Sequence, residues 1–215
     1  ADVLIFDIIQ NKLKTSFKLK IKNKIIHSSN YKFTINAIGS HNILNATASI
    51  VAAKLNGIKN KDINNALTNY VGVKRRFSFI GKKNKSFVYD DYAHHPTEIA
   101  ATLSAAKSLK NKVIVVFQPH RYTRTKILIR EFIKVLSKVD YLFLLETYSA
   151  GEKIIKGATS KDIYSKILKK NKNTIYLKNI GDLNKLMKPY TLHQNTIVFM
   201  GAGSISSIAK KYLNN

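Results

Sequence analysis

The sequence predicts an α/β fold built mainly on a mostly parallel sheet with helices on both faces. From residue 87 onward, short continuous apolar runs alternate with helical patterns, which is typical of strands buried on both faces. The chain has 215 residues, of which 45% are hydrophobic, so it can bury a substantial core. It contains no cysteine, which excludes disulfide frameworks and thiolate metal sites.

The first part of the chain, residues 1–70, has a different pattern and is expected to form a separate unit. Polar and apolar residues alternate over Ser16–Ile21, which predicts a strand with one polar face, and Asn23–Lys24 predicts a hairpin turn. A third short strand is expected over Tyr31–Ile35. The following apolar spacing changes to a helical period, with Gly57 as the expected stop. Two helices are predicted, from Asn42 to Leu55 and over 61–70.

Residues 71–215 are expected to form the second domain. Its strands are predicted at the apolar runs 87–89, 113–117, 141–145, 175–177 and 197–200. Its helices are predicted near 97–110, 125–138, 160–170, 182–188 and 204–213. In open sheets of this kind, ligands bind beyond the carboxyl ends of the strands. The segments that directly follow the strands are therefore the places to search for chemistry.

The charge is strongly positive, because 37 Lys and Arg against 12 Asp and Glu give a net charge of +25. A basic nucleic-acid-binding module is therefore an alternative function, and its affinity would fall steeply with salt. Lys, Asn and Ile are abundant throughout the chain, however, which indicates a general compositional bias, and no nucleic-acid-binding signature appears.

A cytoplasmic location is expected, because no cysteine, signal peptide or membrane span is recognisable. The longest uncharged stretch, Phe33–Ala53, contains several polar residues and is rejected as a membrane helix. The chain begins Ala1-Asp2, and we expect further sequence upstream of it.

Two segments after predicted strands combine Arg, His and carboxylates. Asp90–Glu98 (DDYAHHPTE) follows one strand and begins a helix, and Phe117–Thr125 (FQPHRYTRT) follows another. Only five of the cations are Arg, and four of these lie here or in the Lys74–Phe77 segment (KRRF). Paired Arg side chains favour bidentate binding of phosphate or carboxylate, and a small carboxylate is the expected ligand beside His120.

Alternatives remain for these segments. Asp90 and Asp91 could cap the following helix instead of binding a hydroxyl-rich ligand. A zinc site is not predicted, because adjacent residues cannot converge on one ion. Gly201-Ala202-Gly203 resembles half of a dinucleotide fingerprint, but a tight strand-to-helix turn is the preferred interpretation. No Gly-x-x-x-x-Gly-Lys-Ser/Thr phosphate loop occurs in the chain.

Six motifs in order resemble the bacterial Mur ligase family. They are GSHNILNA (39–46), GVKRRF (72–77), DDYAHHPTE (90–98), FQPHRYTRT (117–125), YSAGE (148–152) and GAGS (201–204). Within the family they are closest to the members that add L-alanine to UDP-N-acetylmuramate. The resemblance implies an ATP-dependent peptidoglycan-synthesis ligase that activates the muramate carboxylate as an acyl phosphate, which the L-alanine amino group attacks.

The resemblance also implies an incomplete enzyme. Residues 1–70 are expected to be the C-terminal part of the central, ATP-binding domain, and 71–215 the Rossmann-like C-terminal domain. The UDP-sugar domain, the phosphate loop and the Mg²⁺ ligands are expected upstream, so no metal ligand is assigned to this chain and it is expected to be inactive alone.

The family's functional residues are carried over by motif. Asn42 and Asn45 match residues on the adenine side of ATP, Asp91 matches the ribose-binding aspartate, and Arg76 matches the arginine that reaches the phosphates. The residues that match the amino-acid pocket are Tyr92, His94, His120, Arg121 and Arg124. The two arginines of this pocket are expected to bind the alanine carboxylate, and either histidine could accept the ammonium proton.

A recycling ligase that joins a tripeptide to the same muramate nucleotide is the alternative within the family. It shares segments like DDYAHHP and GVKRRF. The His-Arg-Tyr-Thr-Arg run at 120–124 favours alanine addition, because specificity depends on contacts in the substrate pocket.

Overall fold

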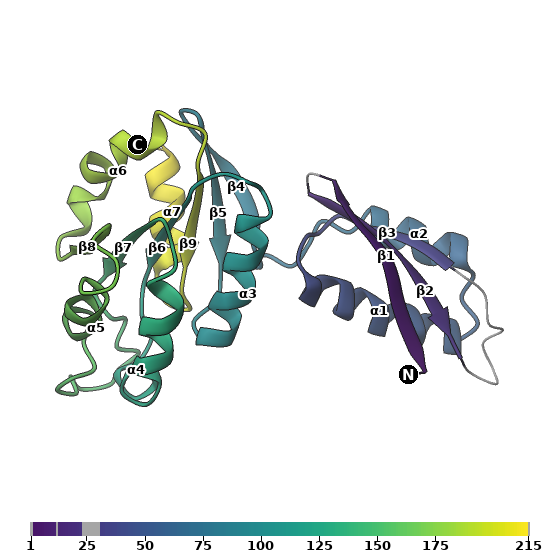
Figure 1. The fold of residues 1–215 in the computed structure, drawn as a ribbon, viewed down its shortest axis with the longest axis horizontal. Coiled ribbons are helices and arrows are strands. Elements are labelled where there is room, and N and C mark those ends of the chain that lie inside the picture. Colours follow the sequence, from purple (N-terminus) through teal and green to yellow (C-terminus); the bar gives the residue numbers. More distant parts are fainter. Residues whose placement is uncertain (1, 12, 23–30, 215) are drawn as a thin grey trace. The chain divides into compact units, whose positions relative to one another are not determined.

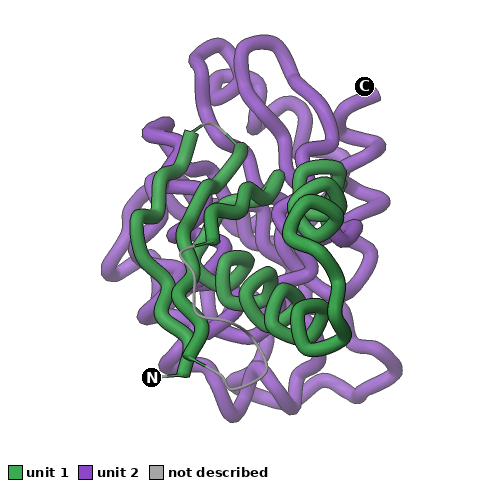
Figure 2. Tube along the Cα trace, turned by 90° about the vertical axis from the view of Figure 1, so that its right-hand side faces the viewer, with its two compact units in different colours: residues 1–72 green, residues 73–215 purple. Residues whose placement is uncertain are grey.

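The computed structural model describes residues 2–11, 13–22 and 31–214. The chain divides into two compact units, residues 1–72 and residues 73–215 (Figure 2). The division falls two residues after the boundary predicted between residues 70 and 71.

The first unit is a three-stranded antiparallel sheet with two helices (Figure 1). Its elements are β1 (Val3–Asn11), β2 (Lys14–Ile21), β3 (Tyr31–Ile35), α1 (Ser40–Leu55) and α2 (Asn60–Thr68). β2 is the central strand and pairs with both others. The predicted third strand and both helices are confirmed, whereas the turn predicted at Asn23–Lys24 lies outside the described residues.

Alternation along β2 determines which face of this sheet is buried. Phe17, Leu19 and Ile21 are buried and pack with Ile43 and Ile50 of α1 in one cluster. Successive side chains of a strand point to opposite faces, so the intervening polar residues lie on the other side.

The second unit is a six-stranded sheet in the order β4-β5-β9-β6-β7-β8. Its strands are β4 (Ser78–Lys83), β5 (Ser86–Asp91), β6 (Val113–Phe117), β7 (Tyr141–Leu145), β8 (Thr174–Leu177) and β9 (Thr196–Met200). All neighbours pair in parallel except β4 with β5, which are antiparallel. The mostly parallel sheet is confirmed, but the sequence did not predict the edge strand β4.

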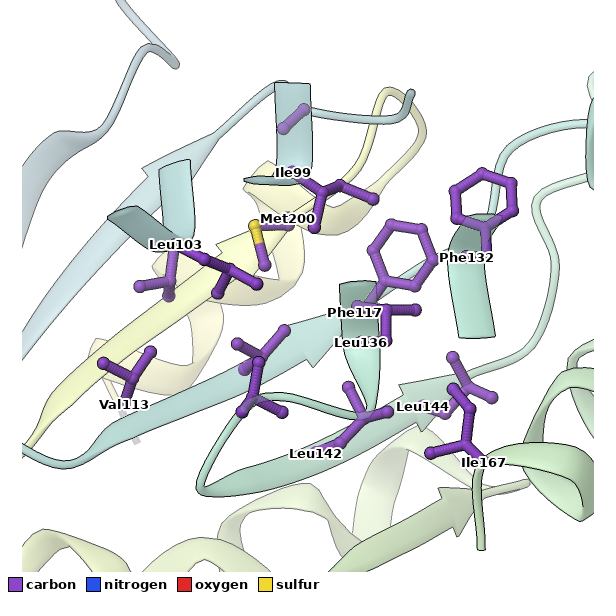
Figure 3. Packing of buried hydrophobic residues seen from close by; sticks show 14 of the residues in the cluster. Ile99, Leu103, Val113, Phe117, Phe132, Leu136, Leu142, Leu144, Ile167 and Met200 are labelled. Atoms are coloured by element: carbon purple, nitrogen blue, oxygen red, sulfur yellow. The ribbon is translucent and has the colours of Figure 1, made fainter. Parts of the chain in front are cut away.

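Helices cover both faces of this sheet, as predicted. They are α3 (Pro96–Lys107), α4 (Tyr122–Leu136), α5 (Ser160–Ile167), α6 (Leu183–Thr191) and α7 (Ile205–Asn214), with a short 3₁₀ turn over Ile180–Asp182. Val113, Val115 and Phe117 of β6 pack in the cluster that includes α3, α4 and α5 residues (Figure 3). Ile114 and Val116 pack with residues of α6 and α7. Burial on both faces explains why the strands are continuous apolar runs.

Among the described residues, no helix combines the length and apolarity that a membrane crossing requires.

Candidate functional site

The carboxyl ends of four parallel strands meet at one edge of the second unit's sheet. Asp91 of β5 and Phe117 of β6 both pair with Met200 of β9, and Phe117 also pairs with Leu144 of β7. The segments that follow these strands are therefore neighbours. The isolated parallel bridge between His120 and Tyr148 joins two of them directly. Both polar segments that the sequence singled out lie at this edge.

Four rings from three of these segments form what we call the histidine cluster: Tyr92, His94, His120 and Tyr148. The ring centroids of His94 and His120 are 6.0 Å apart. Tyr92 meets His94 edge to face at 5.2 Å, and Tyr148 stacks on His120 at 5.5 Å with an interplanar angle of 9°. The structure thus brings the predicted Tyr92, His94 and His120 together.

Arg124 is held against His120 from the first turn of α4. Its Nη1 lies 3.1 Å from His120 Nδ1 and donates to the His120 carbonyl at 3.2 Å. Burial is the largest of the effects that lower the pKa of His120, followed by the positive charges of Arg124, His94 and Arg121. His120 is therefore predominantly neutral at neutral pH.

Arg121 occupies the N-cap position of α4 with a positive φ of 70°. Its backbone N–H donates to the Tyr148 carbonyl at 2.9 Å, and its side chain is exposed. An arginine at the N-cap and another in the first turn, together with the dipole of the helix N-terminus, create a positive end that favours an anion. Glu152 partly balances it, since both of its carboxylate oxygens accept from Thr123, at 3.0 and 2.6 Å.

Asp91 is buried, with 3% of its surface exposed, and both of its oxygens accept backbone N–H groups. Oδ2 accepts from Phe77 N at 2.7 Å and Oδ1 from Ala93 N at 2.6 Å. Burial raises the pKa of Asp91 above its ordinary value, although these hydrogen bonds and Arg76 act in the opposite direction. Asp91 therefore connects the Arg76 segment to the end of β5. Ribose binding by Asp91 stays a prediction.

The two adjacent arginines of the Lys74–Phe77 segment have different environments. Arg75 turns inward, where Nη2 donates to the Gly201 carbonyl at 2.7 Å and the guanidinium carbon lies 4.7 Å from the Tyr92 ring centroid. Its Nε is 3.7 Å from Oδ2 of the buried Asp90. Arg75 is thus a structural contact between the ends of β5 and β9.

Arg76 is more exposed than Arg75, and 52% of its side-chain surface is accessible. Its Nη1 is 4.0 Å from Glu98 Oε1. The residues on either side of it, Arg75 and Phe77, have positive φ angles of 61° and 46°. Left-handed backbone costs a non-glycine residue about 1 kcal/mol, so the segment holds Arg76 outward at some energetic cost.

The helix after β5 is capped by His95 and Glu98, and no capping bond from Asp90 or Asp91 is present. His95 Nδ1 accepts from Thr97 N at 3.3 Å, and Glu98 Oε2 accepts from the backbone N–H groups of His94 and His95 at 3.0 and 3.2 Å. Pro96 occupies the first turn. The alternative of an Asp90 or Asp91 cap is therefore wrong.

Asn42 and Asn45 lie in α1, in the first unit. Asn42 Nδ2 donates to the Ile38 carbonyl at 2.8 Å, and Asn45 is exposed. Both residues therefore lie in residues 1–72, and adenine binding by them stays a prediction.

The turn after β9 requires glycine for steric reasons. A Cβ on Gly201 would lie 2.7 Å from the Gln118 carbonyl oxygen, and one on Gly203 would lie 2.6 Å from Tyr148 Cγ. These approaches explain Gly-Ala-Gly without a bound dinucleotide. Across the described ranges, no group of three or more His, Asp or Glu side chains is arranged to hold a metal ion.

Sequence reasoning assigned no role to Tyr148 or Glu98, although both belong to the site's structure. Tyr148 stacks on His120, and Glu98 Oε2 lies 3.4 Å from His94 Nδ1. The signal was present for both, because Tyr148 belongs to the YSAGE motif and Glu98 to the DDYAHHPTE motif.

Comparisons with known proteins agree on one family. Residues 75–203 match the family model for the Mur ligase, glutamate ligase domain. The UDP-N-acetylmuramate--L-alanine ligase of Buchnera aphidicola subsp. Baizongia pistaciae is 40% identical, covering 99% of this chain and 45% of that protein. The corresponding ligase of Carboxydothermus hydrogenoformans is 38% identical, covering 89% of this chain and 43% of that protein.

A solved structure agrees with these relatives. UDP-N-acetylmuramate-alanine ligase MurC from Thermotoga maritima superposes with a TM-score of 0.80 and 25% identity, over 99% of this chain and 45% of that one. The chain spans less than half the length of the curated relatives it matches.

Proposed function

Since this chain belongs to the Mur ligase family, we propose that it forms part of an ATP-dependent ligase that joins L-alanine to UDP-N-acetylmuramate through an acyl phosphate. Both substrates are inferred from the relatives' names and from the site. Residues 1–70 would contribute to the ATP-binding domain, and 71–215 would be the Rossmann-like C-terminal domain. The remaining parts of the enzyme would come from the upstream half that the relatives possess.

The observation that carries this proposal is the placement of two arginines beside His120, Arg121 at the N-cap of α4 and Arg124 in its first turn. Only Nη1 of Arg124 is hydrogen-bonded to His120. Because a guanidinium has five N–H donors, the others remain available to a carboxylate. The His94 ring lies 6.0 Å from the His120 ring, and Tyr92 contacts His94. A small amino acid bound by its carboxylate here would place its amino group near the two imidazoles.

ATP would bind this chain through residues outside the histidine cluster. Arg76 is exposed and pairs only distantly with Glu98, so it is suited to offset phosphate charge during phosphoryl transfer. Asp91 would contact the ribose, and Asn42 and Asn45 the adenine. The Mg²⁺ ligands are proposed to lie in the upstream half.

The proposal is tested by reconstituting the enzyme. The chain is joined to the upstream half of a relative, and ADP release is measured with UDP-N-acetylmuramate and either L-alanine or a tripeptide. L-alanine-dependent release supports the proposal, and release with the tripeptide alone would replace it by the recycling reaction. Tight, sequence-selective DNA binding at physiological salt would instead favour the nucleic-acid alternative.

Arg124→Ala is expected to raise the KM for alanine by about 10-fold or more, because a charge-assisted hydrogen bond contributes about 1.5–3 kcal/mol. Arg130→Ala is the matched control, since Arg130 lies exposed on the same helix. Equal kinetics for the two variants would exclude Arg124 from carboxylate binding.

A further inference from the structure

The hydrogen bonds of His94 determine which of its ring nitrogens carries the proton. Nδ1 lies 2.9 Å from the Tyr92 carbonyl oxygen and 3.4 Å from Glu98 Oε2. A carbonyl oxygen only accepts, so Nδ1 must be the donor. In the neutral ring the other nitrogen, Nε2, then holds the lone pair.

His120 has the opposite arrangement. Its Nδ1 lies 3.1 Å from Arg124 Nη1, and a guanidinium only donates, so Nδ1 must accept. The proton of neutral His120 is then on Nε2. The basic nitrogen of His120 is already occupied by Arg124, and a second proton there would displace this hydrogen bond.

The surrounding charges favour this division. His120 faces Arg124 and Arg121 of α4 and His94, with Glu152 as the compensating carboxylate. Glu98 of α3 faces His94 and Arg76. Protonating His120 would add a positive charge beside Arg124 and Arg121, whereas the charged group beside His94 Nδ1 is the Glu98 carboxylate.

We propose that His94 Nε2 accepts the proton from the amino group of the amino-acid substrate, an inference that rests on the proposed function. His120 Nε2–H is then a hydrogen-bond donor. Glu98 and the Tyr92 carbonyl are the positioning groups that hold His94 in this tautomer. The two imidazoles thus have distinct roles although their ring centroids are only 6.0 Å apart.

The substrate ammonium loses a proton before it attacks the acyl phosphate. An N–H bond of the substrate ammonium breaks, its proton passes to His94 Nε2, and the electron pair stays on nitrogen. That pair forms the C–N bond with the acyl phosphate carbon, and the C–O bond to the phosphoryl group breaks with its pair leaving on phosphate. The remaining extra proton on nitrogen goes to the departing phosphate.

The tautomers can be measured on the 215-residue chain itself, without activity. Long-range ¹H–¹⁵N spectra of ¹⁵N-histidine protein are recorded about 1.5 pH units above the ordinary histidine pKa of about 6.5. His94→Gln and His120→Asn spectra assign the signals. We expect Nδ1–H for His94 and Nε2–H for His120. Finding Nε2–H for His94, or Nδ1–H for His120, would overturn the proposal.

Kinetics of the reconstituted ligase test the role of His94. His94→Gln should lower kcat by about 10²–10⁴-fold, the usual contribution of a general base, with little change in the KM for alanine and loss of the acidic limb of the pH profile. His120→Asn keeps an acceptor for Arg124 and should raise KM while the acidic limb remains. His193→Gln, an exposed position, is the control.

These outcomes separate the two proposals. If the wild-type assembly releases no ADP with alanine, the proposed function fails, and the spectra still decide the tautomers. If the assembly is active but His94→Gln keeps its acidic limb, or His120→Asn loses it, the assignment of His94 is wrong while the ligase function stands.

Discussion

Asp91 is a candidate ATP contact, and we expect it also to stabilise the fold by anchoring two backbone N–H groups. Measuring the stability of Asp91→Ala without nucleotide tests this anchoring role alone. The substitution removes the acceptors of two backbone N–H groups, Phe77 N at 2.7 Å and Ala93 N at 2.6 Å. Ala93 is fully buried, so water cannot easily replace the lost oxygen there.

The magnitude follows from these two bonds. Hydrogen bonds to a charged group contribute about 1.5–3 kcal/mol each, which gives about 3–6 kcal/mol for the pair. Burying the carboxylate offsets part of this, as the raised pKa of Asp91 indicates. We therefore expect Asp91→Ala to lower the unfolding free energy of the second unit by about 3 kcal/mol. Asp91→Asn keeps one acceptor and should lose roughly half as much.

The assay is native-state hydrogen exchange of peptides from residues 73–215 in increasing urea, because unfolding of residues 1–72 does not contribute to those peptides. Glu131→Ala, an exposed carboxylate on α4, is the control and should stay within about 0.5 kcal/mol of wild type. A loss below about 1 kcal/mol for Asp91→Ala would refute the anchoring role.

Three further substitutions test individual contacts within the second unit. Gly203→Ala places a Cβ 2.6 Å from Tyr148 Cγ and should cost about 1–3 kcal/mol by urea unfolding, clearly more than exposed Gly181→Ala; equal losses would contradict the close approach. Thr159→Ala removes the acceptor of a backbone N–H at 3.2 Å in the first turn of α5 and should cost about 1 kcal/mol; an unchanged urea midpoint would show that the cap contributes nothing. Burial raises the pKa of Glu98, but hydrogen bonds and nearby cations outweigh it and leave that pKa below the ordinary 4.5. Ionised Glu98 therefore stabilises the fold above pH 4.5 and loses this effect as the pH falls. The difference in urea midpoint between wild type and Glu98→Gln should shrink below that pH. A difference that does not change with pH would contradict this expectation.

The parallel strands and their helices could be predicted because burial on both faces leaves an unambiguous pattern. Val113–Phe117 and Tyr141–Leu145 were predicted with the bounds that the structure has. The edge strand β4 was missed, because Ser78–Lys83 is partly exposed and contains a glycine and two lysines, which weaken the pattern.

The site could be predicted as a set of residues but not as a set of bonds. Clustering after strands located His94, His120 and Arg124, since parallel strands end at a common edge. Which nitrogen of each histidine is basic depends on a carbonyl and a guanidinium placed by folding, and no sequence pattern encodes that. For the same reason Asp91 could not be recognised as an acceptor of backbone N–H groups.

The position of β9 has a consequence for biosynthesis. This strand is the last of the sheet to be made, yet it lies between β5 and β6, so β4 to β8 are all synthesised before the middle of the sheet exists. Until then the facing edges of β5 and β6 lack their shared neighbour and expose unpaired backbone. Nascent chains of the second unit should thus depend on chaperones late in translation, and stop codons before Thr196 should yield protease-sensitive products.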